Sequence, residues 1–299
     1  MTTITTADVP ADPIGTVARD GARRRSRARR QAPWGVYVYG GIALALVVLA
    51  VVGPWVVGDV TTVNLRQRLL SPGDHGHLLG TDGQGRDVLA RLIAGARPSM
   101  ISALLPVILS GVVGSALGIA AGMAPGWLHS LLMRILDVFY AFPAVLLAIA
   151  IAAALGTGTT TTVISLSVVL IPPVARVAET ETMRLHGMDF MEVAQASGSG
   201  RVAIAGRMVL PNVLPALLVY ATSLVGLALV FAGGMSFLGL GVAPPRPEWG
   251  QMISEQRQYM YTAPLAALIP AFVIFGASLV FNQLGDALRD LLDIKRSMR

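Results

Sequence analysis

The residues whose types and spacing point most directly to a function lie in a polar segment between two long apolar runs, DFMEVAQASGSGRVAIAGRMVLP at 189–211. Asp189 is placed to cap the amino end of a helix, Glu192 follows in the register of a capping box, and Gly198 supplies the left-handed residue that ends it. The pattern predicts a helix of about two turns. It looks like a loop that couples this chain to another protein, and an ordinary amphipathic loop is the alternative.

A second polar stretch, Gly80 to Asp87, contains three glycines within six residues. Glycine permits the backbone conformations that a tight turn requires, and Asp82, Arg86 and Asp87 could pair within that turn. We interpret the stretch as a structural loop. Direct contact with a docking partner is the alternative.

A third stretch is apolar and stiff, with Gly239 and Gly241 followed by two prolines and Trp249. This composition predicts a re-entrant or interfacial element. Because tryptophan is enriched at the depth of the lipid headgroups, we expect Trp249 to anchor the element there. A gate across a pathway is the alternative role.

The residue types that catalysis or metal binding requires are not arranged for either task. His75 and His77 are two positions apart in a glycine-rich loop without a third ligand of clear spacing. No nucleophile, base and acid occur in a recognisable order. A phosphate-binding loop needs a Gly-Lys-Ser/Thr sequence, yet the only lysine, Lys295, follows Ile294. We therefore expect no catalytic residue, metal ligand or bound cofactor in this chain.

The composition restricts the elements that could position these segments. With 54% apolar and 13% charged residues, 299 residues cannot form one soluble domain without exposing apolar surface. Charges delimit five apolar intervals that can span a membrane, and the Gly-Thr run at 156–162 divides the third into two arms. An all-α membrane protein with six helices follows, with spans at 36–57, 99–122, 138–155, 162–180, 212–232 and 264–284.

The distribution of arginine predicts the orientation. Most of the 23 Lys and Arg residues fall in segments that are cytoplasmic if both termini are cytoplasmic, in agreement with the positive-inside rule. Residues 1–35, which contain RRRSRARR, should be a disordered basic tail near anionic lipid. The expected cytoplasmic segments are also 181–211 and 285–299, and the expected extracytoplasmic loops are 58–98 and 233–263. The spans carry no ionisable residue away from their ends, unlike those of a proton- or sodium-driven carrier.

Four motifs resemble one family. The order Glu192-Val193-Ala194, Gly198, Met208-x-Leu210-Pro211 resembles the EAA loop of ABC importer permeases, with Val193 and Met208 as departures. The segments HLLGTDGQGRDVLARLIAGARPSM, MSFLGLGVAPPRPEWGQMI and LGDALRDLLDIKR are similar to those of the C-type permease in dipeptide, oligopeptide and nickel ABC importers. The resemblance covers residues 77–296.

This resemblance implies a type I ABC importer permease (MetI-like) fold in the cytoplasmic (inner) membrane of a bacterium. It also implies a homologous B-type permease, two cytoplasmic ATPase subunits that bind ATP and Mg²⁺, an extracytoplasmic solute-binding protein, lipid contacts and no nucleic acid. Peptides are the expected solute, with nickel or metal chelates, haem or another small solute as the alternative. A secondary carrier without ATPases and a membrane scaffold are the alternatives from other classes.

The resemblance also assigns site residues. Glu192 would supply a cap and a charge, Ala194 a close approach to the ATPase, and Gly198 the turn. The expected ATPase-coupling residues are Asp189, Phe190, Glu192, Val193, Ala194, Ser197, Gly198, Leu210 and Pro211. The expected extracytoplasmic motif residues are His77, Gly80, Thr81, Asp82, Gly85, Arg86, Asp87, Ser236, Phe237, Gly239, Gly241, Pro244, Pro245, Trp249 and Gly250.

Overall fold

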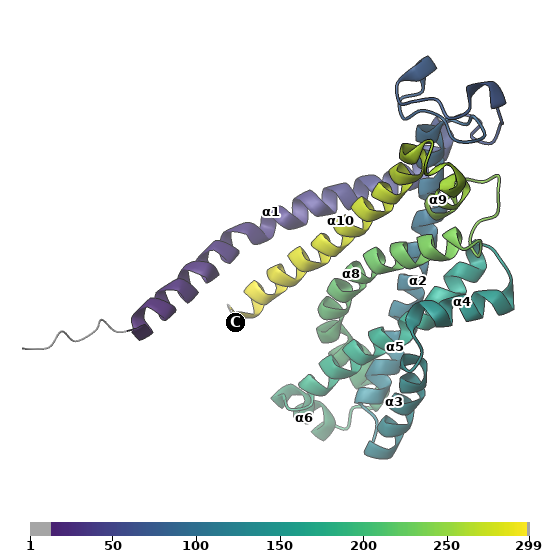
Figure 1. Cartoon of the computed structure of the whole chain (residues 1–299). Coiled ribbons are helices and arrows are strands. Elements are labelled where there is room, and N and C mark those ends of the chain that lie inside the picture. The colour runs from purple at the N-terminus through teal and green to yellow at the C-terminus, as the bar shows by residue number, and fades with distance from the viewer. Residues whose placement is uncertain (1–12, 298–299) are drawn as a thin grey trace, which may run out of the picture.

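Long apolar helices make up most of the chain in the computed structural model, which describes residues 13–297 (Figure 1). Five helical stretches are long and apolar enough to cross a membrane, and a bent pair of helices supplies a sixth. The predicted all-α membrane protein with six spans is confirmed. The five long helices are α1 (Pro13–Val56), α2 (Val88–Gly122), α5 (Thr159–Leu185), α8 (Leu210–Phe237) and α10 (Pro264–Ser297).

The third span differs from the continuous helix predicted at 138–155. It consists of α3 (Gly126–Tyr140) and α4 (Ala144–Leu155), which meet at an angle of 84°. Pro143 is the cause, because proline lacks an N–H and disfavours helical geometry in the residue before it. The turn predicted after this span is confirmed, since Gly156 and Gly158 have positive φ values of 94° and 136° between α4 and α5.

Several helices extend beyond their predicted ends. Helix α2 begins at Val88 rather than at 99, because the Asp87 carboxylate caps it by accepting a hydrogen bond from the Ala90 N–H at 2.7 Å. Its 35 residues are about 50 Å long, so α2 reaches past the membrane core. Helix α10 likewise continues past residue 284 to Ser297.

The basic tail also differs from the expected disorder. Helix α1 starts at Pro13, so the backbone of the arginine-rich segment continues the helix of the first span. Alanine and arginine have high helix propensities, which favours this continuation. Residues 1–12 of the expected tail lie outside the described residues.

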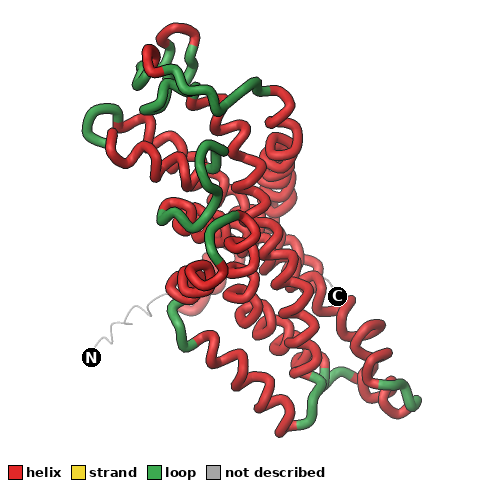
Figure 2. Tube along the Cα trace, turned by 90° about the vertical axis from the view of Figure 1, so that its right-hand side faces the viewer, coloured by secondary structure: helices red, strands yellow, loops and turns green. Residues whose placement is uncertain are grey.

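Two groups of connecting segments lie at opposite ends of the bundle (Figure 1), and other loops lie between them (Figure 2). Residues 57–87, with the short helices η1 (Leu65–Gln67) and η2 (Asp74–Gly76), lie beside α9 (Trp249–Gln256) and η4 (Arg257–Tyr259) at what we call the loop-rich end. Helix α6 (Asp189–Ala196) lies at the opposite end. The ends of α1 and α10 that carry the termini point away from the loop-rich end, and their cytoplasmic location stays a prediction.

The packing of α2 against α5 is the most extensive contact between helices. Gly114, Gly118 and Gly122 lie one turn apart on α2 and face α5, where a Cβ atom at Gly118 would lie 2.2 Å from the Ala175 carbonyl oxygen. Small residues allow two helix backbones to approach this closely inside a membrane. Helices α1, α8 and α10 pack around this pair and complete the main apolar core.

Candidate functional site

Helix α6 is the short polar helix that the sequence predicted, and one of its faces is fixed to the bundle. Met191 and Ala194 are three residues apart, are 1% and 3% exposed, and belong to the main apolar core. The side chains of Phe190 and Val193 are exposed. The helix is therefore held firmly by one side and presents apolar surface on the other.

The individual roles expected within α6 are only partly reproduced. Gly198 has a φ of 76°, as its left-handed turn required, and the Ser197 hydroxyl donates to the Ala194 carbonyl at 2.9 Å. Ala194 faces the core of its own chain, so its surface is not free to approach a partner as expected. Asp189 is the first helical residue rather than the residue before the helix, and Glu192 is exposed.

The chain returns to the bundle through an irregular helix. Two short elements follow Gly198, namely α7 (Arg201–Ile204) and the π-helical turn η3 (Ala205–Val209). Helix α8 then begins with Leu210 and Pro211, and proline leaves a carbonyl in the preceding turn without its helical donor. The Asn212 side chain donates to the Met208 carbonyl at 2.7 Å. Leu210 and Pro211 thus lie where the segment that contains α6 joins the bundle.

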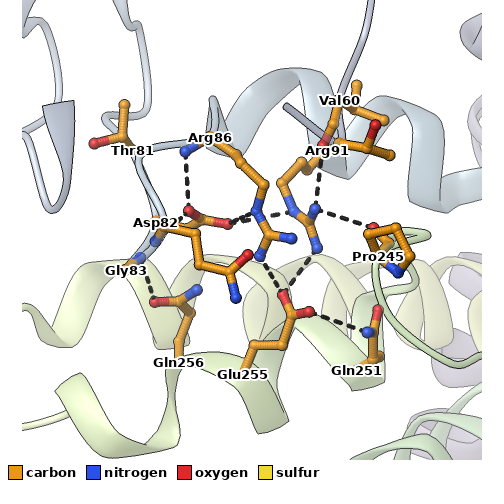
Figure 3. Close-up of polar contacts among 12 residues, drawn as sticks. Val60, Thr81, Asp82, Gly83, Arg86, Arg91, Pro245, Gln251, Glu255 and Gln256 are labelled. Atoms are coloured by element: carbon orange, nitrogen blue, oxygen red, sulfur yellow. Dashed lines mark hydrogen bonds and ion pairs between the residues drawn. The ribbon is translucent and has the colours of Figure 1, made fainter. Parts of the chain in front are cut away.

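A buried group of charges, which we call the polar cluster, lies at the loop-rich end and consists of Asp82, Arg86, Arg91 and Glu255 (Figure 3). The Arg86 guanidinium contacts Asp82 Oδ2 and Glu255 Oε2, each at 2.6 Å. The Arg91 guanidinium contacts Glu255 Oε2 at 2.9 Å and Asp82 Oδ2 at 3.5 Å. The two arginines and Asp82 are at most 3% exposed, and Glu255 is 14% exposed. Two positive charges therefore balance two negative charges away from water.

The polar cluster ties three parts of the chain together. Arg91 Nη1 also donates to the carbonyl oxygens of Val60, at 3.2 Å, and Pro245, at 3.4 Å. The Gly83 N–H donates to Gln256 Oε1 at 3.1 Å. Residues 57–87, the start of α2 and helix α9 are thereby connected by charged and polar contacts (Figure 3).

The turn before α2 forms as the sequence predicted, with one difference. Asp82 and Arg86 pair locally, but Asp87 caps α2 and contacts His77 Nδ1 at 2.7 Å. Gly80 and Gly85 have positive φ values, and a Cβ atom at Gly85 would lie 1.8 Å from a backbone oxygen. These glycines are therefore required by the backbone of the turn.

Thr81 fixes this turn to the preceding segment. Its hydroxyl donates to the Gln67 carbonyl and accepts from the Leu70 N–H at 2.9 Å. Thr81 also pairs with Asp87 in an isolated antiparallel bridge. Thr81 is 2% exposed, and its hydroxyl both donates and accepts hydrogen bonds within the chain.

Helix α9 is capped and held by a buried carboxylate. Glu248 is 1% exposed and accepts hydrogen bonds from the N–H groups of Gly250, at 3.3 Å, and Gln251, at 3.1 Å. The Ser99 hydroxyl of α2 donates to the same carboxylate at 3.2 Å. Burial raises the pKa of Glu248, and the hydrogen bonds that the carboxylate accepts oppose that rise. Glu248 therefore joins the start of α9 to α2.

The expectation that Trp249 anchors the chain at headgroup depth is wrong. Trp249 is 1% exposed, and its indole Nε1 donates to the Leu92 carbonyl of α2 at 2.9 Å. Its backbone N–H donates to the Ser99 hydroxyl at 3.1 Å. A tryptophan with its apolar ring buried and its N–H satisfied belongs to the interior rather than to the membrane interface.

Replacing Trp249 by phenylalanine should lower stability modestly. The substitution removes the indole donor, which costs about 1 kcal/mol, and leaves a small void because phenylalanine is smaller than the buried indole. We expect thermal unfolding of the purified protein in detergent to shift downward by at least about 2–4 °C. Trp127→Phe is the matched control, since Trp127 is 72% exposed. Equal shifts for the two variants would contradict the role assigned to the Trp249 N–H.

The other motif residues lie between α8 and α9. Ser236 and Phe237 end α8, Gly239 has a φ of 85°, and Pro244 and Pro245 are exposed. A Cβ atom at Gly241 would lie 1.7 Å from the Ser236 hydroxyl oxygen, and one at Gly250 would lie 2.3 Å from the Gly233 carbonyl oxygen. These glycines thus permit close packing of the segment against α8.

Three charged residues of the loop-rich end were not predicted from the sequence: Arg91 and Glu248, which are buried, and Glu255, which is 14% exposed. The burial of Arg91 could have been predicted, because an arginine in the apolar first turns of a long helix requires acceptors or negative charges around it. Glu248 and Glu255 look like ordinary polar residues of a loop. Among residues 34–292, apart from position 195, no group of three or more His, Asp or Glu side chains is placed to hold a metal ion.

The chain is similar to proteins of known transport systems. The family described as "Binding-protein-dependent transport system inner membrane component" matches residues 114–297. The glutathione transport system permease protein GsiD of Escherichia coli O6:K15:H31 is 40% identical over 219 residues, which cover 73% of this chain and 72% of that protein. The protein of the same description from Pectobacterium atrosepticum is 39% identical and covers 73% of each chain.

Solved structures show the same fold. Chains of the MetNI methionine ABC transporter in inward-facing conformations match with TM-scores of 0.53 and 0.51 in two crystal forms. The matches cover 67% and 66% of this chain and 97% and 96% of those chains, at 17% sequence identity. The MetI-like permease fold implied by the motifs is therefore confirmed.

Proposed function

Because the chain belongs to the family of binding-protein-dependent transport system inner membrane components, we propose that it forms half of the pathway of an ATP-driven importer of small peptides. The observation that carries the choice of solute is the 40% identity, over almost three quarters of this chain, to permeases of glutathione transport systems. Glutathione is itself a small peptide. Short peptides with free termini are accordingly the first solutes to test.

The partners of this inner membrane subunit follow from the same family. We infer a homologous B-type permease that completes the pathway, an extracytoplasmic binding protein that delivers the solute, and two cytoplasmic ATPase subunits. ATP and Mg²⁺ would be bound by those ATPases, and this chain would carry out no catalytic step.

The geometry of α6 supports a role in coupling. Phe190 and Val193 offer an exposed apolar surface that an ATPase can contact, while Met191 and Ala194 fix the helix to the core. A displacement of the exposed face would therefore move the bundle rather than α6 alone. Such movement would switch the pathway between outward and inward openings as the ATPases close and reopen.

Uptake of labelled glutathione or dipeptides into proteoliposomes that contain the assembled importer and ATP tests this proposal. Gly198→Val should lower ATP-dependent uptake by about tenfold or more, because a side chain at its φ of 76° costs about 1–2 kcal/mol and favours unwinding of α6. Gly200→Val is the matched control in the same segment, since its φ is −64° and no atom lies within 4 Å of an added Cβ atom.

Loss of uptake in an assembled Gly198→Val complex, with the Gly200→Val complex active, would support the coupling role. Uptake that continues without ATP would contradict an ATP-driven importer and favour a secondary carrier. ATP hydrolysis stimulated by the binding protein without uptake of any peptide would overturn the choice of solute, and chelated metals and haem would be tested next.

A further inference from the structure

A cavity of about 250 Å³ lies at the corner between α3 and α4, facing α5 and α8. Five aromatic side chains line it: Phe139, Tyr140, Phe142, Tyr220 and Phe231. Apart from the two tyrosine hydroxyls, every lining side chain is apolar. The volume is below the roughly 300–1,000 Å³ of a site that encloses a whole small molecule. The cavity is therefore suited to one apolar part of a solute.

The α5 wall of this cavity also offers hydrogen-bond acceptors. Pro172 and Pro173 both line the cavity, and neither has an N–H to donate to the preceding turn. The carbonyl oxygens of Val168 and Val169 therefore lack their usual helical donors, and Val169 itself lines the cavity. A carbonyl without its helical donor, close to aromatic rings, favours N–H and ammonium groups.

An ion pair lies next to the cavity. The Arg176 guanidinium of α5 contacts the Asp137 carboxylate of α3, and their side chains are 43% and 51% exposed. On α3, the cavity-lining Tyr140 follows Asp137 by three residues. On α5, the cavity-lining Pro172 precedes Arg176 by four residues. Residues three or four apart lie on the same face of a helix, so on both helices the charged residue and the cavity lining share one face. The charges are therefore about one helical turn from the aromatic rings.

The exposure of this ion pair indicates the direction in which the face points. Charged side chains that face lipid hydrocarbon cost several kcal/mol, so intramembrane charges face the bundle interior or a water-filled cavity. Asp137 directly precedes the span predicted at 138–155, Arg176 lies near the end of the span predicted at 162–180, and about half of each side chain is uncovered. We therefore expect this face to be directed towards water or towards the second permease rather than towards lipid.

We propose that the cavity and the Asp137–Arg176 pair form one binding site for a zwitterionic solute with an apolar side chain. The solute's carboxylate would accept two parallel hydrogen bonds from the Arg176 guanidinium, and its ammonium group would donate to the Asp137 carboxylate and the Val169 carbonyl. Its apolar side chain would occupy the aromatic cavity. The inference rests on the proposed function, since a small peptide with free termini has this combination of groups.

The lack of cysteine in the chain allows a direct test. In the purified importer, a cysteine introduced as Ala144→Cys would lie in the cavity wall, and one introduced as Ser130→Cys would lie on the exposed surface of α3. The rate of modification by N-ethylmaleimide is measured with and without alanyl-phenylalanine, in the free form and with both termini blocked. Charge-assisted pairing of both termini should make the free dipeptide slow modification of the cavity cysteine about tenfold.

Protection of the cavity cysteine should disappear with the blocked dipeptide and with Arg176→Gln, return in part with Arg176→Lys, and never occur at position 130. Equal protection by free and blocked dipeptides would overturn the role of the ion pair. Slow modification regardless of any peptide would indicate a lipid chain in the cavity and would overturn the site. Uptake measured in parallel separates the two proposals: protection without ATP-dependent uptake would contradict only the proposed function, and uptake without protection only the site.

Discussion

Replacing Glu255 with alanine is expected to destabilise the loop-rich end more than any other single change among its charges. Glu255 Oε2 accepts from both Arg86, at 2.6 Å, and Arg91, at 2.9 Å. Removing it leaves two guanidinium groups that are almost fully buried with only Asp82 as a counter-charge. Breaking a buried ion pair by removing one partner costs about 3–5 kcal/mol, because the remaining charge stays desolvated.

The loss should appear as a fall of about 10 °C in the thermal unfolding temperature of the purified protein in detergent. It should also appear as faster proteolysis of residues 57–87, which the polar cluster holds against α9 (Figure 3). Arg184→Gln serves as the control, because the Arg184 contact with Glu181 lies on the surface and such pairs contribute about 0–1 kcal/mol. If the two variants unfold at the same temperature, the polar cluster does not hold the loop-rich end together.

A double-mutant cycle separates the ion pairs from simple loss of volume. When Glu255→Ala and Arg86→Ala are combined, the double variant should be more stable than the sum of the two single losses predicts, because the second substitution removes a charge that the first left unpaired. Additive losses would show that the contacts contribute packing rather than charge pairing.

The spans and the polar helix could be predicted from the sequence because their signals are local. Apolar runs of sufficient length are expected to cross a membrane. The turn at Gly156–Thr162 is predicted by consecutive glycine and threonine residues. Gly198 was predicted for the same reason, since the end of a short helix needs a left-handed residue nearby. Each of these features is determined by residues close together in the chain, so it can be predicted from the sequence.

The packing of the loop-rich end could not be predicted, because it depends on residues far apart in the chain. Glu255 meets Arg91 across 164 positions, and Trp249 meets Leu92 across 157. Without those partners, a tryptophan beside prolines at the end of a span looks like an interfacial anchor. The bend at Pro143 was not predicted for a different reason. The apolar run that contains it is long enough for one span, and hydropathy alone does not show where a helix within such a run is interrupted.

Replacing Gly118 with valine should prevent the close contact between α2 and α5, and this is the second large effect that we expect. An added Cβ atom would lie 2.2 Å from the Ala175 carbonyl oxygen and 2.6 Å from the Ala178 Cβ atom. Neither helix can move away locally, because Gly114 and Gly122 contact the same partner one turn on either side. Overpacking costs typically about 1–3 kcal/mol, and two rigid backbones place this case at the upper end.

The same substitution on the same helix at Gly111 provides the control for helix propensity and for apolarity. A Cβ atom added at Gly111 meets no atom of another helix within 4 Å, so Gly111→Val adds its branch point in open space. We expect the Gly118 variant to unfold at a temperature roughly 5–10 °C lower in detergent and to accumulate poorly in membranes, while the Gly111 variant remains close to wild type. Equal stability of the two variants would mean that α5 can retreat from α2. In that case the glycines would not determine the helix spacing, which in turn sets the position of Pro172 and Arg176 relative to the rest of the bundle.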